Sequence, residues 1–457
     1  MASTDNLGGT CFCTSHSSRE REIQSRTCRS TSLRDWIFHL SLVTCHPSLS
    51  EVSRPRSPLF VLFLTVFIDL VGFGIVIPIL PLYAEHFHAS PVTIGWLTGI
   101  YSGMQIIFTP ILGKLSDRFG RKPVLFVSIV GTALGFALMG LAQSLTLLFA
   151  ARILAGITGG NISIPQAYIA DVTAPEKRSR AMGMIGAAFG LGFTFGPLIG
   201  GMMSRISYGA PFFFAAGLAV INAALVYLIL PESLSREHRA KPHEEASITE
   251  VFRHGRGAMF AIVVGTYFFL IVGFSIMTTL YALFTEKRFG YDAQANGYLF
   301  GFVGIVSVIV QGGLIGRLIK MFGEVALARA GMVLTAISLA LLPLSSSLTV
   351  LLLVSAGLSC GSGFASPPLS GLASQMIERS WQGRALGVMQ SAGSTARLLG
   401  PLLGGWLLMF DLRKPLTEYA RTPFLVGALL CLVGAILAFC VKKPAEDRSA
   451  DDIAPGL

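Results

Sequence analysis

Apolar and polar residues alternate along most of this chain in long blocks. From Pro58 onward, apolar stretches of about 20 residues, enough for a helix to cross ~30 Å of hydrocarbon, are separated by short polar segments. The short period-two stretches of a membrane β-barrel are missing, so the pattern predicts helices. Twelve stretches fit this description: 58–83, 92–113, 123–143, 146–170, 181–203, 211–230, 258–284, 296–319, 325–345, 348–374, 384–409 and 422–441.

The first six predicted helices resemble the last six. The longest interior polar segment separates the two groups, and RAMGMIGAAFGLGFTFGPLIGG (180–201) aligns with RALGVMQSAGSTARLLGPLLGG (384–405). Duplicated parallel halves are typical of secondary transporters. The predicted fold class is an all-α membrane protein with twelve transmembrane helices in two pseudo-symmetric six-helix bundles. The predicted organisation is a disordered cytoplasmic tail at 1–57, a bundle at 58–230, a cytoplasmic linker at 231–257, a bundle at 258–441 and a cytoplasmic tail at 442–457.

Composition and charge favour a membrane protein over other classes. Charged residues make up 13% of the chain and the mean hydropathy is +0.65, whereas a soluble protein carries about twice that charged fraction. The net charge of +10 does not indicate nucleic-acid binding, because the basic residues are spread between apolar stretches. Cytoplasmic segments would carry roughly three times as many Lys and Arg as external loops if the N-terminus is inside. We therefore expect a multi-pass protein of the plasma (inner) membrane with both termini in the cytoplasm.

The sequence offers no cofactor site and no catalytic cluster within the apolar stretches. Cys11, Cys13 and His16 do not have zinc-ligand spacing, and no GxxxxGK[ST] segment is present, so neither a metal nor ATP is expected. No Ser–His–Asp group occurs in the stretches, which argues against an enzyme. The expected partners are a small-molecule substrate, protons and the lipid bilayer, and the chain is expected to act as a monomer.

Three charged residues lie deep within the predicted spans: Asp69 in the first, Arg152 in the fourth and Arg397 in the eleventh. An ionised group inside the bilayer is costly unless it is paired or hydrated, so each is a candidate functional residue. Asp69 is the one acid among them, and a partly dehydrated carboxyl group can bind and release protons near neutral pH. The sequence therefore predicts proton coupling through Asp69.

Asp69 and Arg152 are expected at similar depths in the bilayer. At ~1.5 Å per residue their heights differ by ~5 Å, which an arginine side chain can bridge. In a coupling pair, protonation of Asp69 would free Arg152, and substrate binding would do the reverse. The alternative is a permanent structural ion pair with no role in transport.

Arg397 has no acidic partner in its half of the sequence, so it could anchor an anionic or polar group of a substrate. The alternative is a cation satisfied by water, by Gln311 or Gln390, or by helix carbonyl groups. The amides of Asn161, Gln166 and Gln311 are further candidates for lining a substrate cavity. Interhelical hydrogen bonds would explain these amides equally well.

The segment GKLSDRFGRKP (113–123) carries five charges between the second and third predicted helices. Its copy in the second half, GRLIKMFG (316–323), keeps both glycines but has Lys320 in place of Asp117. Asp117 can cap a helix or pair with Arg121. An acid present in one copy alone favours a specific gating role over an ordinary cytoplasmic loop. The predicted gating residues are Gly113, Asp117, Arg118, Gly120, Arg121 and Lys122.

The fifth predicted helix has a glycine-rich face that ends in GPLIGG (196–201). Gly192, Gly196 and Gly200 recur every fourth residue, which gives a smooth stripe for close helix packing, and Pro197 can kink the helix. The eleventh helix repeats the hexapeptide as GPLLGG but lacks the upstream glycines. The extended glycine face therefore belongs to the fifth helix alone.

Together these motifs resemble the major facilitator superfamily. GKLSDRFGRKP resembles its signature loop, RILAGITGG (152–160) its second motif, and GLGFTFGPLIGG (190–201) the antiporter motif of proton-coupled drug exporters. The resemblance covers about residues 58–441 and points to the twelve-helix tetracycline-efflux type. It implies that Asp117 latches the halves together on the cytoplasmic side and that Arg152 assists proton transfer. The antiporter-motif residues that it implies are Gly190, Gly192, Gly196, Pro197, Gly200 and Gly201.

Two features depart from the tetracycline-efflux pattern. Those exporters carry an aspartate in the third helix, where this chain has Gly135, and an acid inside a span of the second half, where this chain has none. The resemblance therefore implies the scaffold and drug export, without implying a metal–tetracycline substrate in particular.

The predicted function is proton-coupled export of small amphipathic or lipophilic compounds by alternating access, with one proton per cycle through Asp69. One alternative is a facilitator or symporter for a sugar or organic anion, centred on Arg397. A more remote alternative is a non-transporting membrane sensor, against which the retained Gly–Pro motif argues.

Overall fold

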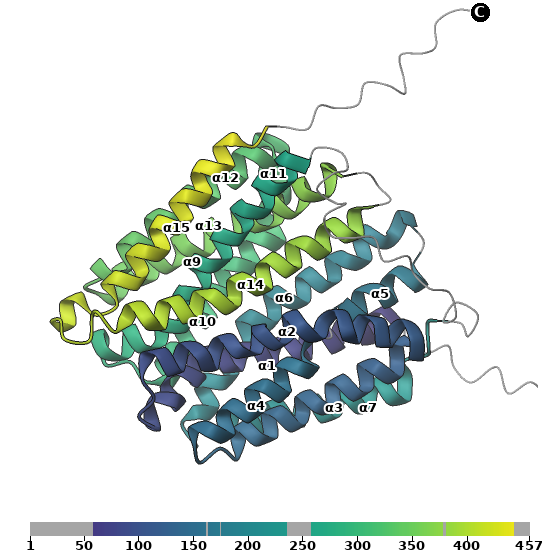
Figure 1. The fold of residues 1–457 in the computed structure, drawn as a ribbon, viewed down its shortest axis with the longest axis horizontal. Helices are drawn as coiled ribbons and strands as arrows, with labels where there is room; N and C mark the ends of the chain where they lie inside the picture. The colour runs from purple at the N-terminus through teal and green to yellow at the C-terminus, as the bar shows by residue number, and fades with distance from the viewer. Residues whose placement is uncertain (1–57, 161–162, 174, 235–256, 378–380, 443–457) are drawn as a thin grey trace, which may run out of the picture. The chain divides into compact units, whose positions relative to one another are not determined.

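The computed structural model describes residues 58–160, 163–173, 175–234, 257–377 and 381–442. These residues belong to one compact unit and are almost entirely helical (Figure 1). The predicted tail at 1–57, most of the linker and nearly all of the last tail lie outside them. The helices are α1 (Pro58–His86), α2 (Pro91–Phe119), α3 (Arg121–Gly140), α4 (Leu145–Thr158), α5 (Ser163–Val172), α6 (Pro175–Ser204), α7 (Ala210–Ile229), α9 (Gly257–Phe289), α10 (Ala293–Val308), η3 (Ile309–Leu314), α11 (Ile315–Phe322), α12 (Glu324–Leu341), η4 (Leu342–Leu344), α13 (Leu348–Gln375), α14 (Gln382–Leu408), η6 (Leu416–Glu418) and α15 (Arg421–Cys440).

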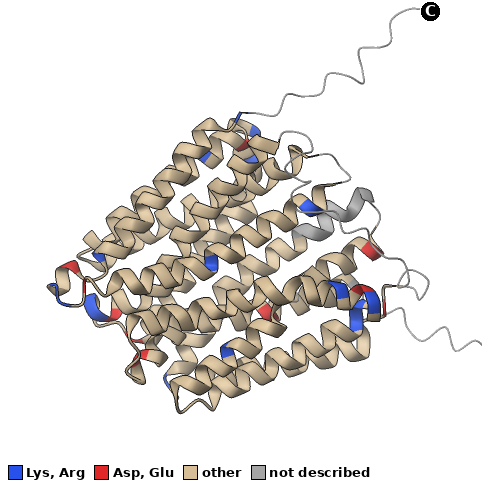
Figure 2. Ribbon diagram, in the orientation of Figure 1, with Lys and Arg blue, Asp and Glu red and all other residues tan. Residues whose placement is uncertain are grey.

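Each of the twelve predicted apolar stretches coincides with a helix or a broken helix. Among the described residues, ten helical segments are long and apolar enough to cross a membrane. The remaining two, α2 and α14, are of similar length, 29 and 27 residues, but contain more polar positions. Charged residues gather near the helix ends, and few lie in between (Figure 2). We call α1–α7 the first half of the protein and α9–α15 the second half.

The span predicted over 146–170 is present as Leu145–Val172, but the structure divides it into α4 and α5. Helix α4 ends at Thr158 with Gly159 as its C-cap, and Gly160 follows at once. A Cβ atom at Gly160 would lie 2.7 Å from Oγ1 of Thr109, so the chain here approaches α2 more closely than a side chain allows. Two successive glycines therefore permit the close contact and also weaken the helix at that point.

The eighth predicted helix is continuous but irregular. Between α10 and α11 it winds for six residues as a π-helix, η3, which contains Gly312 and Gly313. Such turns are rare in helices and occur frequently at functional sites. The irregular part of this span lies between its middle and the end that joins α12.

Four helices start at the same end of the bundle, and each has a polar side chain as its N-cap. Ser90, Ser144, Asp292 and Ser347 accept hydrogen bonds from backbone N–H groups in the first turns of α2, α4, α10 and α13. These caps satisfy donors that the helix itself leaves free. We call this end, where α1 finishes and α2 begins, the α1–α2 end, and the opposite one, where α2 meets α3, the α2–α3 end.

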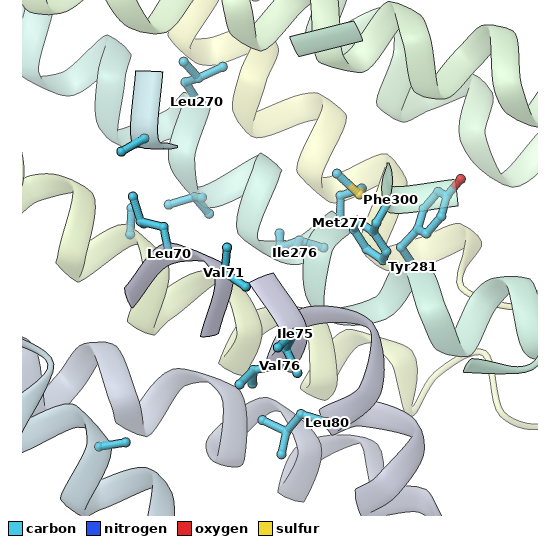
Figure 3. Close-up of a cluster of buried hydrophobic side chains, with 14 of the residues drawn as sticks. Leu70, Val71, Ile75, Val76, Leu80, Leu270, Ile276, Met277, Tyr281 and Phe300 are labelled. Atoms are coloured by element: carbon cyan, nitrogen blue, oxygen red, sulfur yellow. The ribbon is translucent and has the colours of Figure 1, made fainter. Parts of the chain in front are cut away.

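The largest contacts between the two halves are those of α6 with α10, α2 with α14 and α1 with α9. Apolar side chains fill the interior around these contacts. Figure 3 shows a buried cluster in which Leu70, Val71 and Ile75 of α1 lie near Ile276 and other residues of α9. Helices α1 and α9 are equivalent in the two halves, and the contact of α2 with α14 duplicates that of α10 with α6, as expected for duplicated parallel halves.

The halves pack tightly at the α1–α2 end and separate at the α2–α3 end. A Cβ atom at Gly297 of α10 would lie 2.6 Å from the carbonyl oxygen of Pro197 in α6. Farther along the same two spans, Gly186 and Gly313 have no atom within 4 Å of the place a Cβ would take. The described residues thus form a conformation that is closed at the α1–α2 end and open at the α2–α3 end.

Candidate functional site

Asp69 lies inside α1, with its Oδ1 atom buried. It falls on the stretch of α1 that packs against the antiporter motif, because the next residue, Leu70, contacts Gly192 of α6. Tyr101 of α2 is within electrostatic range of Asp69, Arg152 and Arg397. The phenol of Tyr101 therefore lies among all three charged residues that the sequence places deep in spans.

Arg152 is buried in α4 and is held by α2. Its Nε and Nη2 atoms donate hydrogen bonds of 3.2 Å each to the carbonyl oxygens of Leu97 and Thr98. Its guanidinium lies over the ring of Tyr101, 4.5 Å from the ring centroid. Helix carbonyl oxygens and an aromatic face together stabilise a cation that has left water.

The structure does not form the ion pair between Asp69 and Arg152 that the sequence suggests. Both described residues lie in the region of Tyr101, yet the donor groups of Arg152 are directed to backbone oxygens of α2. The spacing of residues along each span gives the depth of Asp69 and Arg152 in the bilayer, but not the direction of either side chain. In this conformation Arg152 is therefore held by the backbone of α2.

The candidate cavity residues do not converge on one point. Arg397 of α14 donates to Ser394, one turn earlier, and lies near Tyr267 of α9 around Gly393. Gln311 is exposed in η3 and donates to Ser307 on its own helix. Gln166 is exposed on α5, and Asn161 lies outside the described residues. Both of these hydrogen bonds stay within a single span, so neither joins two helices.

One face of α6 carries the antiporter-motif glycines that meet α1. A Cβ atom at Gly196 would lie 2.6 Å from the carbonyl oxygen of Val71, and Gly192 and Gly200 approach the same helix. No other residue allows two helix backbones this close, so the spacing of four brings α1 and α6 into direct contact within the first half.

A second face of α6 meets α10 across the interface between the halves. A Cβ atom at Gly201 would lie 2.8 Å from a backbone atom of α10, and one at Gly190 would lie 3.2 Å from the side chain of Val308. Pro197 lies inside α6, and its carbonyl oxygen also faces α10. The motif therefore has two packing surfaces, one within the first half and one between the halves.

The segment predicted as a gating loop is not a loop, since nearly all of it is helical. Gly113, Asp117 and Arg118 lie in the last turns of α2, and Arg121 and Lys122 begin α3. Gly120 alone joins the helices, with φ of 109°, a backbone conformation that other residues rarely adopt. The equivalent joint between α11 and α12 also has a glycine with positive φ.

Asp117 is bonded within its own half. Its carboxylate lies 2.5 Å from Nη1 of Arg121, whose Nε lies 3.2 Å from Asp171 of α5 and whose Nη1 also donates to Ser116. The resemblance implies that Asp117 latches the two halves together. In this conformation the α2–α3 end is open, and Asp117 makes its ion pair inside the first half instead.

Glu232 completes this cluster and was not predicted. Its carboxylate accepts hydrogen bonds from the backbone N–H groups of Arg121 and Lys122, so it caps the N-terminus of α3. Ser233 donates to Asp171, and Tyr168 donates to the carbonyl oxygen just before Glu232. An acid after the sixth helix was visible in the sequence, but its partner lies 111 residues away.

The fold and its buried charges define a multi-pass membrane transporter made of two similar halves. The sequence profile described as Major Facilitator Superfamily matches residues 62–396 and 312–455. The chain belongs to the major facilitator superfamily.

Relatives with assigned roles match nearly the whole chain. A class C tetracycline resistance protein of Escherichia coli is 34% identical over 87% of this chain and 98% of its own length. Multidrug resistance protein 2 of Bacillus subtilis (strain 168) is 28% identical over 88% of this chain and 99% of its own. The crystal structure of a bacterial homologue of the human lysosomal transporter Spinster, inward-facing and unoccupied, matches with a TM-score of 0.70 at 16% identity, covering 84% of this chain and 96% of its own.

Proposed function

We propose that this protein exports small amphipathic or lipophilic compounds from the cytoplasm in exchange for protons. The observation that carries the proposal is Asp69, an acid inside α1, beside the antiporter motif of α6 and in range of Tyr101. The names of the relatives, tetracycline resistance and multidrug resistance proteins, support this substrate class. The exporter would act as a monomer in a plasma or inner membrane.

The α2–α3 end faces the cytoplasm in this proposal. Basic residues of the joint between α2 and α3, such as Arg118 and Lys122, lie there, and cytoplasmic segments are rich in Lys and Arg. The described conformation is then inward-facing, with its external end closed. The two six-helix halves, 58–230 and 258–441, would rock against each other, opening the contacts of α6 with α10 and leaving those of α6 with α1 intact.

Asp69 would bind a proton from outside and release it to the cytoplasm. Arg152 would supply a positive charge, held in this conformation by the carbonyl oxygens of α2. A nearby fixed cation favours the ionised carboxylate and so assists proton release. One proton per cycle then makes the export of a monovalent cation electrically silent and the export of a neutral compound electrogenic.

Transport by purified protein in lipid vesicles under an imposed pH gradient tests the proposal. Ethidium serves as the monovalent cation and a neutral lipophilic dye as the comparison. Gradient-driven flux should disappear in Asp69→Asn and persist in Asp69→Glu. Glu418→Gln, at a half-exposed acid paired with Arg421, serves as the control. Equal flux in Asp69→Asn and the unaltered protein would falsify the proposal.

A further inference from the structure

A second acidic site lies between the halves at the α1–α2 end. Nζ of Lys287 in α9 lies 2.7 Å from Oε1 of Glu85 in α1. The adjacent carboxyl group of Glu286 lies within hydrogen-bonding reach of the carboxyl group of Glu85. Each half thus contributes one acid to the contact, and the second half adds the lysine.

The carboxyl oxygens of Glu85 and Glu286 need one shared proton to complete their hydrogen bonds. The Oε2 atoms of Glu85 and Glu286 are both buried, and neither has a hydrogen-bond donor among the described residues. Two ionised carboxylates can only accept hydrogen bonds, so neither group can satisfy the other. A single proton held between them would supply the missing bond and, with Lys287, leave the cluster neutral.

The two acids are equivalent residues of the duplicated halves. LVGFGIVIPILPLYAEH (70–86) aligns without gaps with IVGFSIMTTLYALFTEK (271–287), which puts Glu85 opposite Glu286. An axis that relates the halves brings equivalent residues of α1 and α9 together at the interface. The same alignment puts Leu270 opposite Asp69, so the glutamate occurs in both halves and the aspartate in one.

The other titratable groups around the pair do not balance its charge. Tyr208 and Tyr419 are within electrostatic range of both carboxyl groups, and His86 packs on the ring of Tyr208 at 5.6 Å between centroids. Asp292, also in range of Tyr208, caps α10. Among the described residues Lys287 is the cation paired with this cluster, so the acids exceed it by one charge when both are ionised.

We propose that Glu85 and Glu286 form a proton-binding site shared by the two halves, and that one proton bound there holds the α1–α2 end closed. Opening that end parts the two carboxyl groups, hydrates them and releases the proton. When both acids are ionised, their repulsion across the interface favours the open end. Closure thus binds one proton from the medium that this end faces.

This site makes closure of the external end depend on external protons, in addition to the transfer through Asp69. The assignment of the α1–α2 end to the external side of the membrane rests on the proposed function. The coupling between protons and closure does not, because it concerns the equilibrium between two conformations and needs no substrate. A low external pH would drive the empty exporter toward the inward-facing state.

Distances between spin labels in lipid nanodiscs test the proposal from pH 5 to pH 9. With the native cysteines replaced by serine, one pair of labels is placed at the exposed positions Ile206 and Leu412 of the α1–α2 end, and a reference pair at Phe119 and Met321 of the other end. The measurements use an Asp69→Asn background, so that Asp69 cannot contribute. The ratio of closed to open molecules should rise at least ~10-fold as the pH falls.

Glu286→Gln and Glu85→Gln should each stay closed across the whole range, with less than a ~2-fold change in the ratio. Two variants are used because one of them could fail to fold. Glu418→Gln, at a half-exposed acid of the same end that pairs with Arg421, should keep the full pH response. A ratio that does not respond to pH in the Asp69→Asn background overturns the proposal. So does a pH response that survives in both glutamine variants. A protein that keeps the pH response but exports no drug would contradict the proposed function and leave the shared proton site standing.

Discussion

Replacing Gly297 with alanine should shift the exporter toward the conformation that is open at the α1–α2 end. A Cβ atom at this position of α10 would lie 2.6 Å from the carbonyl oxygen of Pro197 and 2.7 Å from Cα of Gly201. Both atoms belong to the backbone of α6, so neither can move aside cheaply. Overpacking of this kind costs about 1–3 kcal/mol, and the contact exists only while this end is closed. The ratio of closed to open molecules should therefore fall by roughly 5–150-fold.

The label pairs at both ends of the bundle measure this shift at constant pH. Gly196→Ala is the matched control, because its Cβ would press on Val71 of α1 within the first half. It should lower the thermal stability of both conformations and leave their ratio unchanged. Gly316→Ala meets no atom within 4 Å and should change neither quantity. Equal effects of Gly297→Ala and Gly196→Ala on the ratio would refute the assignment of α6 and α10 as the moving contact.

Two further substitutions test the charged residues of the first half. Arg152→Lys keeps the positive charge beside Asp69 and should retain pH-driven flux within ~10-fold, whereas Arg152→Gln should lose more. Both should lower stability by about 1–3 kcal/mol through lost hydrogen bonds, and equal flux in the two variants would exclude a role for the charge. Glu232→Gln removes the negative charge at the N-terminus of α3 and should destabilise the protein by about 0.3–1 kcal/mol. An unchanged unfolding midpoint in detergent would contradict the cap.

The sequence predicts the helices well because length and hydropathy decide which segments can cross a bilayer. It misses the division between α4 and α5, since the twin glycines there serve a contact with α2 that only the assembled structure contains. It also misses how the segment around Gly120 becomes two helices joined by one residue. A run of charges suggests a loop, yet a single glycine with positive φ is enough to turn the chain.

The candidate site was harder to predict, because hydropathy gives the depth of a residue and not the direction of its side chain. Asp69 and Arg152 were rightly placed inside spans, but the partners of Arg152 are carbonyl oxygens of Leu97 and Thr98. Every residue carries such an oxygen, so no residue type marks the place. Contacts between the halves are equally hidden, because they depend on the conformation. Asp117 illustrates this, since its partner in this conformation is Arg121 of the same half rather than a residue of the second half.

The two acidic sites on α1 lie too far apart to exchange a proton directly. Asp69 and Glu85 are separated by roughly 24 Å along the helix at ~1.5 Å per residue. A proton bound between Glu85 and Glu286 can therefore influence Asp69 only by changing the conformation of the halves. Duplication accounts for the difference between the sites. Residues that meet across the interface are contributed by both copies, as the glutamates are. The proposed carrier of one proton per cycle needs an acid in one copy alone, and Asp69 lies opposite Leu270.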